Sequence, residues 1–169
     1  MKTIEYEKTY LAKYIPEDIS NYECVEITDI YPKYGKGING PRFRKRNDKY
    51  EITKKVLINN DPSAQTEHTI ILSKEEFEVL TKVEAYKIIK KRYLYNGAEI
   101  DIFEDKLKGL VLVDFEFKSE EEKNNFKMPD YCLTDVTEES IIAGGNLSSK
   151  TIEDLREFFE KYGYILIKT

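Results

Sequence analysis

The chain has 169 residues, of which 40% are hydrophobic and 35% are charged, with 13 tyrosines, 8 phenylalanines and no tryptophan. This length fits one domain with a substantial core, so we expect residues 1–169 to form a single domain. The formal net charge of −5 argues against double-stranded nucleic acid as a partner, because a duplex requires a basic surface.

The sequence also lacks the marks of a membrane or secreted protein. No apolar run approaches the roughly 20 residues that span a bilayer, and residues 1–10 lack the apolar core of a signal peptide. We therefore expect a cytoplasmic protein with no membrane partner. Cys24 and Cys132 are far apart and neither belongs to a CxxC pair, so we expect two isolated buried thiols rather than a zinc site or a redox pair.

Alternation of apolar and polar side chains, which is typical of strands, recurs along the first two thirds of the chain. Asn47-Asp48 and Tyr95-Asn96-Gly97 predict tight hairpin turns. Short connections favour a meandering antiparallel sheet, and eight such strands can close into a barrel in which the first and last strands meet. The predicted fold is α+β, mainly antiparallel β, with a closed eight-stranded barrel. The expected strands are 3–12, 23–31, 41–47, 50–57, 65–72, 86–94, 98–104 and 109–118.

Three helices are expected on the periphery of this barrel. Ser73 opens a capping-box pattern, Ser119 precedes three glutamates, and Thr151 precedes apolar residues at helical spacing. The last helix and its tail, within residues 148–169, are expected to pack on the barrel. Pro62-Ser63 is expected to mark a loop.

Two acidic pairs lie on one face of their strands. Glu5 and Glu7 alternate with apolar residues near the amino terminus, while Asp114 and Glu116 interrupt a strand of Leu, Val and Phe. Each pair alone is compatible with a solvent-facing strand. If the first and last strands close the barrel, the four carboxylates meet in its interior and can hold Mg²⁺ or Mn²⁺, which prefer oxygen ligands.

Basic side chains follow the same alternation. Taken singly, these residues could protect an edge strand or add solubility. Taken together, they place about five cations on the inferred inner face, which suits a multi-phosphate ligand. The residues are Arg42, Arg44, Lys55, Lys90 and Arg92.

Two other features are given no functional role. Residues 35–40 match the dinucleotide fingerprint GxGxxG, but Pro41 and an arginine-rich strand follow where the motif needs a helix, so we expect a loop. His68, the only histidine, alternates away from the face that holds Glu67, so we expect a structural or exposed position.

The order and spacing of these charges resemble the CYTH superfamily, the triphosphate tunnel metalloenzymes. The resemblance covers about residues 3–147. Its motifs are ExExK at Glu5-Tyr6-Glu7-Lys8-Thr9, RxR at Arg42-Phe43-Arg44, TxK at Thr53-Lys54-Lys55, KxRY at Lys90-Lys91-Arg92-Tyr93, ExDxF at Glu99-Ile100-Asp101-Ile102-Phe103 and GLxxxExE over 109–116, with Asp114 for the first Glu.

The resemblance implies a tunnel with a charged lumen, in which carboxylates bind Mg²⁺ or Mn²⁺ and basic residues hold a triphosphate. Lys90 or Glu7 would orient or deprotonate the attacking water. The implied metal ligands are Glu5, Glu7, Asp114 and Glu116, with Glu67. The implied phosphate ligands are Arg42, Arg44, Lys55, Lys90 and Arg92.

The implied function is metal-dependent hydrolysis of inorganic triphosphate or of a small organic triphosphate. Thr9 stands where the ExExK motif has Lys, and Thr69 stands where the family has a second acid after Glu67. Two alternatives therefore remain: a class IV type adenylate cyclase, and a polyphosphate- or nucleotide-binding module without turnover. The expected partner is a small molecule carrying a triphosphate, and a homodimer is left open.

Overall fold

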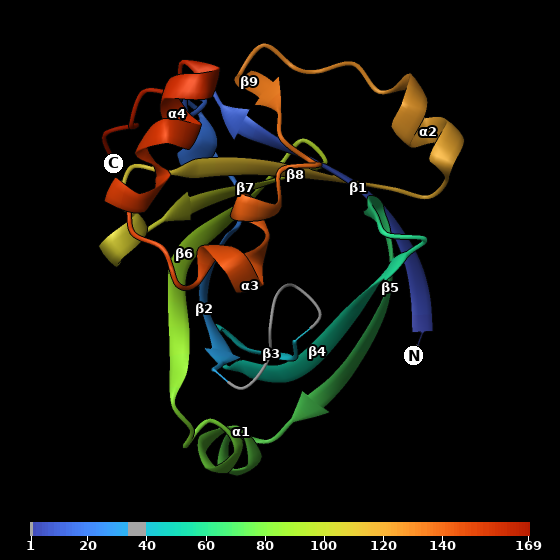
Figure 1. Ribbon diagram of the computed structural model, residues 1–169, viewed down its shortest axis with the longest axis vertical. Coiled ribbons are helices and arrows are strands. Elements are labelled where there is room, and N and C mark those ends of the chain that lie inside the picture. The colour runs from blue at the N-terminus through green and yellow to red at the C-terminus, as the bar shows by residue number, and fades with distance from the viewer. Residues whose placement is uncertain (1, 34–39) are drawn as a thin grey trace.

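A computed structural model of the protein describes residues 2–33 and 40–169 (Figure 1). One antiparallel sheet has the strand order β5-β4-β3-β2-β6-β7-β8-β1-β9, and β5 also pairs with β1. Eight strands therefore form a closed barrel, as predicted. The strands are β1 (Lys2–Ala12), β2 (Cys24–Pro32), β3 (Arg42–Arg46), β4 (Lys49–Ile58), β5 (Asp61–Leu72), β6 (Ala85–Tyr95), β7 (Ala98–Phe103), β8 (Val111–Phe117) and β9 (Cys132–Asp135).

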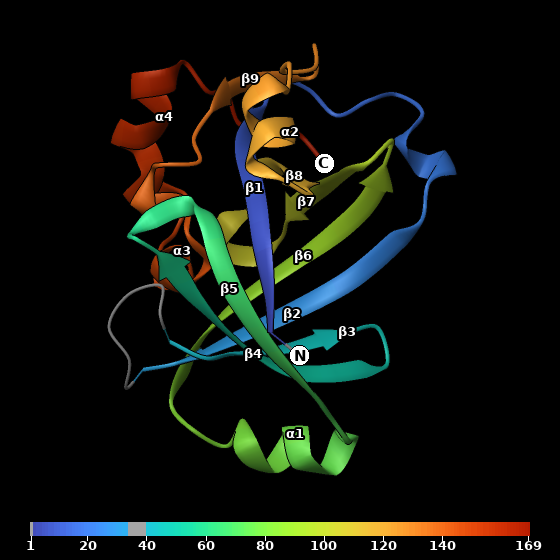
Figure 2. The ribbon, with the colours of Figure 1, turned by 90° about the vertical axis from the view of Figure 1, so that its right-hand side faces the viewer.

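Strand β1 closes the barrel because both of its edges are paired. One edge pairs with β8 from Tyr6 to Leu11, so the first and last barrel strands meet as expected. The other edge is divided: residues 2–6 pair with β5, and residues 10–12 pair with β9. Figure 2 shows β1 and β5 crossing on the side of the barrel that faces the viewer. Strand β9, which the sequence did not predict, thus completes the edge that β5 leaves open.

The pairing is not the simple meander that short connections favoured. Strand β2 pairs with β3 and β6, and β1 lies next to β5 and β8. The connection from β5 to β6 contains α1 (Lys74–Leu80) and is long enough to carry the chain to the far side of β2. A helical connection of this length releases consecutive strands from direct pairing.

Tight turns with left-handed residues join several strands. Asn47 and Asn96 have φ of 49° and 47°, and Gly97 follows at 82°, as the hairpin predictions require. A third turn at Asn59 and Asn60 (φ 52° and 61°) was not predicted. Because Asn tolerates this conformation, β5 begins at Asp61, and the expected loop at Pro62-Ser63 is wrong: both residues lie in the strand.

The predicted helix starts are found near the expected caps. Ser73 accepts a hydrogen bond from the backbone of Glu76 at 3.1 Å, and the Glu76 carboxylate accepts one from the backbone of Ser73 at 2.7 Å, which completes the capping box of α1. Ser119 caps α2 (Glu120–Asn125). After Thr151 a 3₁₀ turn precedes α4 (Arg156–Tyr162). No helix in residues 2–33 and 40–169 is long and apolar enough to cross a membrane.

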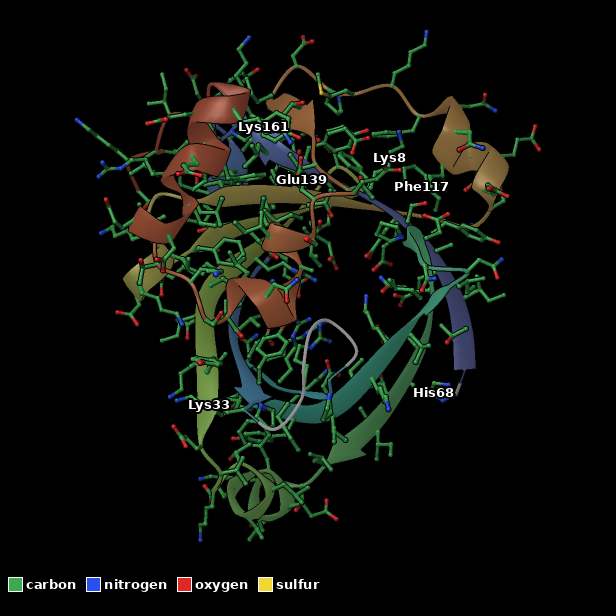
Figure 3. All side chains as sticks on the ribbon, viewed as in Figure 1. Lys8, Lys33, His68, Phe117, Glu139 and Lys161 are labelled. Carbon is green, nitrogen blue, oxygen red and sulfur yellow. The ribbon has the colours of Figure 1, made fainter. Side chains whose placement is uncertain are left out.

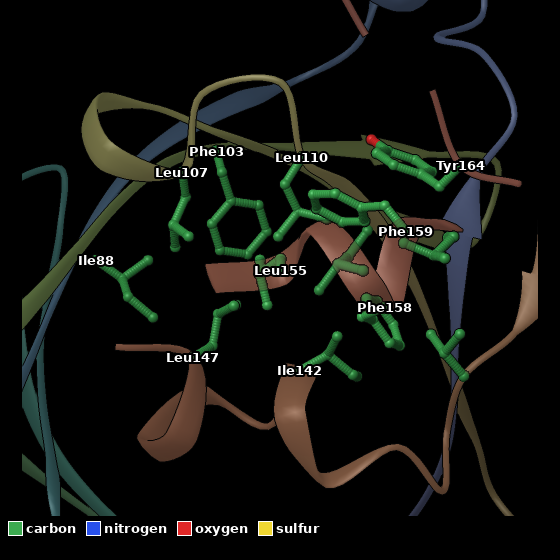
Figure 4. Close-up of a cluster of buried hydrophobic side chains, with 13 residues drawn as sticks. Ile88, Phe103, Leu107, Leu110, Ile142, Leu147, Leu155, Phe158, Phe159 and Tyr164 are labelled. Carbon is green, nitrogen blue, oxygen red and sulfur yellow. The ribbon is translucent and has the colours of Figure 1, made fainter. Parts of the chain in front are cut away.

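An apolar cluster joins the C-terminal segment to inward-facing residues of the barrel, among them Ile88, Phe103 and Leu112 (Figure 4). Phe158 and Phe159 of α4 pack with Phe103 of β7 and with Leu110, and Ile142 lies in the same cluster. A second cluster covers the outer faces of β1, β7 and β8. The second core therefore lies outside the sheet, whereas the first covers part of the barrel interior beside the C-terminal segment. Polar and charged side chains line most of the remaining interior.

The two cysteines differ in exposure. Both are free; Cys132 is buried, but Cys24 is exposed. Cys24 begins β2 on the outer face, where Glu26 is also exposed, whereas the inward residues Val25 and Ile27 are buried. The expectation of two buried thiols is therefore wrong for Cys24.

Candidate active site

A cavity of about 670 Å³ lies inside the barrel, and its lining comes from all eight barrel strands and from residues 137–147. Figure 3 shows side chains projecting into the space that the strands enclose, while His68 is exposed on the outside. The expected loop at residues 35–40 falls outside the described residues except for Gly40. All ten sequence-predicted site residues line the cavity: Glu5, Glu7, Arg42, Arg44, Lys55, Glu67, Lys90, Arg92, Asp114 and Glu116.

Strand alternation explains why these residues converge. In β8, Val111, Val113 and Phe115 are buried in the outer cluster, so Asp114 and Glu116 must point inward. This arrangement reverses the usual barrel, in which apolar side chains fill the interior.

Arg44 is held by an acid that the sequence analysis missed. Its Nε lies 2.6 Å from Oδ1 of Asp29, and its Nη2 lies 2.8 Å from Oδ2. Burial alone would raise the pKa of Asp29, but the Arg44 charge and hydrogen bonds hold that pKa far below its usual value. The sequence did contain a sign of this role, because Asp29 follows Val25 and Ile27 on the inward face of β2. A charge on an apolar face requires a buried partner.

A second buried acid, Asp101, binds two of the predicted phosphate ligands. It accepts hydrogen bonds from Nε and Nη2 of Arg92, both at 2.7 Å, and from Nζ of Lys90. Arg92 also pairs with Glu99. Burial lowers the pKa of Lys90, although the Asp101 charge opposes the change. These bidentate contacts fix the guanidinium planes in the cavity wall.

Arg42 differs from Arg44 and Arg92 because its Nε is buried without a hydrogen-bond partner in the described part of the chain. That atom lies 3.9 Å from Oδ1 of Asp29, beyond hydrogen-bond range. An unsatisfied buried donor costs about 1–3 kcal/mol. The cavity therefore contains a cationic donor that an anionic ligand would satisfy.

The opposite side of the cavity is acidic, with Lys55 at its centre. The Lys55 ammonium lies 2.9 Å from Glu5, 3.7 Å from Glu7 and 3.4 Å from Glu67. Its pKa is raised, since these carboxylates outweigh the opposing effect of burial. One ammonium thus shares three carboxylates, which leaves this region with excess negative charge.

Glu7 shows the effect of that excess. Burial is the main cause that raises its pKa to about 7, and Asp114, Glu5 and Glu116 raise it further while Lys55 opposes them. Glu7 stands directly opposite Glu116 in the pairing of β1 with β8, and like charges in this position repel. Gln65, which the sequence analysis did not single out, donates a hydrogen bond to Glu7 at 2.5 Å.

The pKa values of Asp114 and Glu116 are raised as well. Burial is the main cause for both, followed by the charge of Asp101 for Asp114 and of Glu99 for Glu116. Five carboxylates therefore lie near one lysine, Lys55, and the pKa values of three of them are raised. The five are Glu5, Glu7, Glu67, Asp114 and Glu116, and the three are Glu7, Asp114 and Glu116.

Comparison with known proteins yields solved structures alone: no protein-family model and no curated protein matches the sequence. One structure of the protein NE1496 is 25% identical, covers 87% of this chain and 99% of its own, and has a TM-score of 0.62. A second structure of NE1496, described as an inorganic triphosphatase, is 24% identical over 86% and 95% of the two chains, with a TM-score of 0.61. The PH1012 protein from Pyrococcus horikoshii is 20% identical over 71% and 82%, with a TM-score of 0.51.

The closed barrel with its charged lumen is a CYTH-like tunnel fold. The chain is similar to the CYTH superfamily in this fold and in the order of its charge motifs. The departures from the CYTH motifs can now be placed in three dimensions.

At positions 9 and 69, where the sequence differs from the CYTH motifs, there are threonines, and both donate hydrogen bonds to carboxylates. Thr9 donates from Oγ1 to Asp114 at 2.6 Å, and Thr69 donates to Glu67 at 2.8 Å. Lys8 faces away from the tunnel and pairs with Asp135 at 3.3 Å. The tunnel therefore lacks a cation at position 9 and has neutral hydrogen-bond donors in its place.

The carboxylates suit a hard divalent cation by their chemistry. They supply oxygen donors, and the raised pKa of Glu7, Asp114 and Glu116 shows that added positive charge would relieve their repulsion. In the ranges 2–33 and 40–169, however, no three acidic, histidine or cysteine side chains are already grouped as a metal site. Lys55 lies among Glu5, Glu7 and Glu67, so it would have to yield part of this contact.

One end of the tunnel is lined by the segment 137–147. Ile142 and Leu147 anchor this segment in the apolar cluster of Figure 4. Gly144 faces Tyr31 so closely that any Cβ at this position would collide with the tyrosine hydroxyl. The small residue therefore permits the segment to approach β2.

Proposed function

We propose that this protein hydrolyses inorganic triphosphate or a small organic triphosphate, with Mg²⁺ or Mn²⁺ bound in the tunnel. This proposal rests on the opposite charges of the two walls of the tunnel. Arginines, one of which has an unsatisfied donor, lie opposite a cluster of carboxylates. The likeness to NE1496, an inorganic triphosphatase at 24% identity, supports the same reaction class.

The basic wall is suited to hold the phosphates. Arg44 and Arg92 each keep an orientation fixed by a buried aspartate, so they need little rearrangement on binding. Arg42 offers its unsatisfied Nε, and Lys55 and Lys90 add positive charge. Charge-assisted hydrogen bonds of this kind are the usual means of phosphate recognition.

The acidic wall would hold the divalent cation through Glu5, Glu7, Asp114 and Glu116, with Glu67. A bound cation would act as a Lewis acid on phosphoryl oxygens and would offset the negative charge of the tunnel. That offset matters, because eleven acidic residues of the described lining face six basic ones. Without added positive charge, this lining would repel a triphosphate.

Glu7 is the better candidate for moving the proton. Lys90 donates to Asp101 and is therefore engaged as a cation. In the proposed reaction, water attacks the terminal phosphorus, its proton passes to Glu7, and the bridging P–O bond breaks. The products are orthophosphate and the remaining diphosphate, which is pyrophosphate when the substrate is inorganic triphosphate.

The test is product release from inorganic triphosphate, thiamine triphosphate and ATP, each with Mg²⁺, Mn²⁺ or EDTA. We expect orthophosphate from at least one triphosphate only when a divalent cation is present. Cyclic AMP and pyrophosphate from ATP would instead establish the cyclase alternative. Turnover that is unchanged in EDTA would contradict the metal requirement.

The binding module without turnover has one observation in its favour. Thr9 and Lys55 already satisfy several of the acids, so the tunnel is partly neutralised without a metal. A ligand that binds only the folded state raises its stability. Thermal stabilisation by triphosphate, with no product formed under any metal condition, would favour this alternative over hydrolysis.

A further inference from the structure

Arg46 ends β3 and lines the tunnel beyond the RxR pair. It lies on the same face as Arg42 and Arg44, while the intervening Lys45 is exposed. The sequence offered protection of an edge strand as a reason for such a run. That reason fails, because β3 pairs with β2 on one side and with β4 on the other.

The Nε of Arg46 is buried and has no hydrogen-bond partner in the described residues, as is also true of Arg42. Between them, the Nε of Arg44 is satisfied by Asp29. Arg46 is also absent from the tunnel ion pairs of the described chain, which use Arg42, Arg44, Lys55, Lys90 and Arg92. Two unsatisfied arginine donors thus flank a satisfied one in a single row.

The length of the row distinguishes Arg46 from Arg42. The two lie four positions apart, which is about 13 Å at the usual rise of a strand. The row is longer than three linked phosphoryl groups measured between their terminal phosphorus atoms, so a longer chain would match its length better. In the register, Arg46 lies opposite Ile27, whose other neighbour is Lys90, so this end also holds the cations of β6.

We propose that Arg46 binds a phosphoryl group beyond those of a triphosphate, so that the tunnel accepts linear inorganic polyphosphates of four or more phosphoryl groups. This inference rests on the proposed hydrolase function. Water attacks the terminal phosphorus of the chain, the bridging P–O bond breaks, and orthophosphate leaves together with a chain shorter by one unit. The proton of the water passes to Glu7 as for triphosphate.

Glu51 is the acid that could pair with Arg46 in place of a ligand. It lies opposite Arg44 in the pairing of β3 with β4 and lines the same tunnel. Its carboxylate nevertheless leaves the Nε of Arg46 without a partner in the described structure. The unsatisfied donor therefore points to a ligand rather than to an internal ion pair.

The test compares Arg46→Gln with Lys45→Gln, which removes the same charge from the outer face of the same strand. Initial rates with triphosphate and tetraphosphate give kcat/KM for each substrate, and thermal unfolding verifies the fold. A charged hydrogen bond is worth about 1.5–3 kcal/mol, so Arg46→Gln should lower kcat/KM for tetraphosphate roughly 10- to 100-fold. The loss for triphosphate should stay within about threefold, and Lys45→Gln should change neither.

Equal losses for both substrates, or wild-type values in Arg46→Gln, would overturn the role of Arg46 while leaving the triphosphatase intact. Calorimetric titration with tetraphosphate separates the two proposals if no turnover occurs. Tighter binding of tetraphosphate than of triphosphate, reversed by Arg46→Gln, would support the extended row even then. Absence of turnover with every triphosphate would count against the hydrolase alone, and tetraphosphate affinity no greater than that of triphosphate would refute the extension.

Discussion

The two walls of the tunnel solve the problem of buried charge in different ways. On β2, β3, β6 and β7, Arg44 is paired with Asp29, and Arg92 with Asp101, in bidentate contacts. On β1 and β8, Glu7 and Glu116 stand directly opposite each other, and the pKa of each is raised. The first wall has its countercharges built in, whereas the second has one lysine, Lys55, among five carboxylates.

This difference indicates a division of labour. Guanidinium groups that are already fixed by buried aspartates can meet phosphates without reorganisation. Carboxylates that remain mutually repulsive gain most from a cation that arrives with the substrate. We therefore propose that the basic wall determines the geometry of a bound ligand, while the acidic wall makes ligand binding depend on metal and on pH.

The strongest way to break the comparison is to remove a built-in countercharge. Asp101→Asn should lower the free energy of unfolding by about 3–5 kcal/mol, because it leaves the buried Arg92 and Lys90 without their anion. Urea unfolding monitored by circular dichroism measures the change. Glu104→Gln is the control, since its pair with Lys91 at 3.2 Å is exposed and should contribute less than about 1 kcal/mol. Equal effects of the two substitutions would refute the structural role of Asp101.

Removing an acid from the other wall should affect activity instead. Glu7→Gln should lower kcat for triphosphate about 100-fold or more, the usual contribution of a general base, without destabilising the fold above neutral pH. Stopped assays of phosphate release at saturating substrate and metal give kcat. Glu26→Gln on the exposed face of β2 provides the matched control. Full activity in Glu7→Gln would remove Glu7 from the reaction.

The pH dependence of stability sharpens the contrast. The pKa of Glu7 rises from 4.5 to about 7 on folding, so the unionised form stabilises the folded protein fully below about pH 4.5. This stability is lost as the pH rises through about 7, and we expect a loss of about 3 kcal/mol from Glu7. Denaturant titrations at pH 5 and pH 8 should show a smaller change in Glu7→Gln than in the wild type. Mg²⁺ added at pH 8 should restore part of the lost stability.

The smallest effect is expected from adding a charge to the acidic wall. Thr9→Lys places a cation beside Asp114, and we expect a few-fold lower KM for triphosphate, consistent with one added charge contact. Thr9→Val is the comparison, because both substitutions remove the hydrogen bond to Asp114 while only lysine adds charge. Weaker binding in both variants would mean that the hydrogen bond matters more than the missing cation.

Alternation of side chains was sufficient to predict the strands of the barrel and the inward face of all ten proposed site residues. It could not predict the strand order, because pairing depends on where the connection through α1 delivers β6. It also missed β9, which has four residues and too little sequence for a periodic pattern. Asp29 was overlooked although it shares the inward face of β2 with Val25 and Ile27, and Asp101 was named within the ExDxF motif but given no role. The ion-pair partners of both lie on neighbouring strands, and the alternation along one strand does not identify them.

The divided edge of β1 has a consequence for how the chain tolerates shortening. Residues 10–12 gain their backbone partners from Cys132, Thr134 and Asp135, more than a hundred positions later. A polypeptide that ended before Cys132 would leave those backbone amide and carbonyl groups unpaired on the edge of β1 that closes the barrel. Exposed strand edges pair with other chains, so such a fragment should self-associate. Its loss from solution would then result from the unpaired edge of β1 and not from a change in the tunnel.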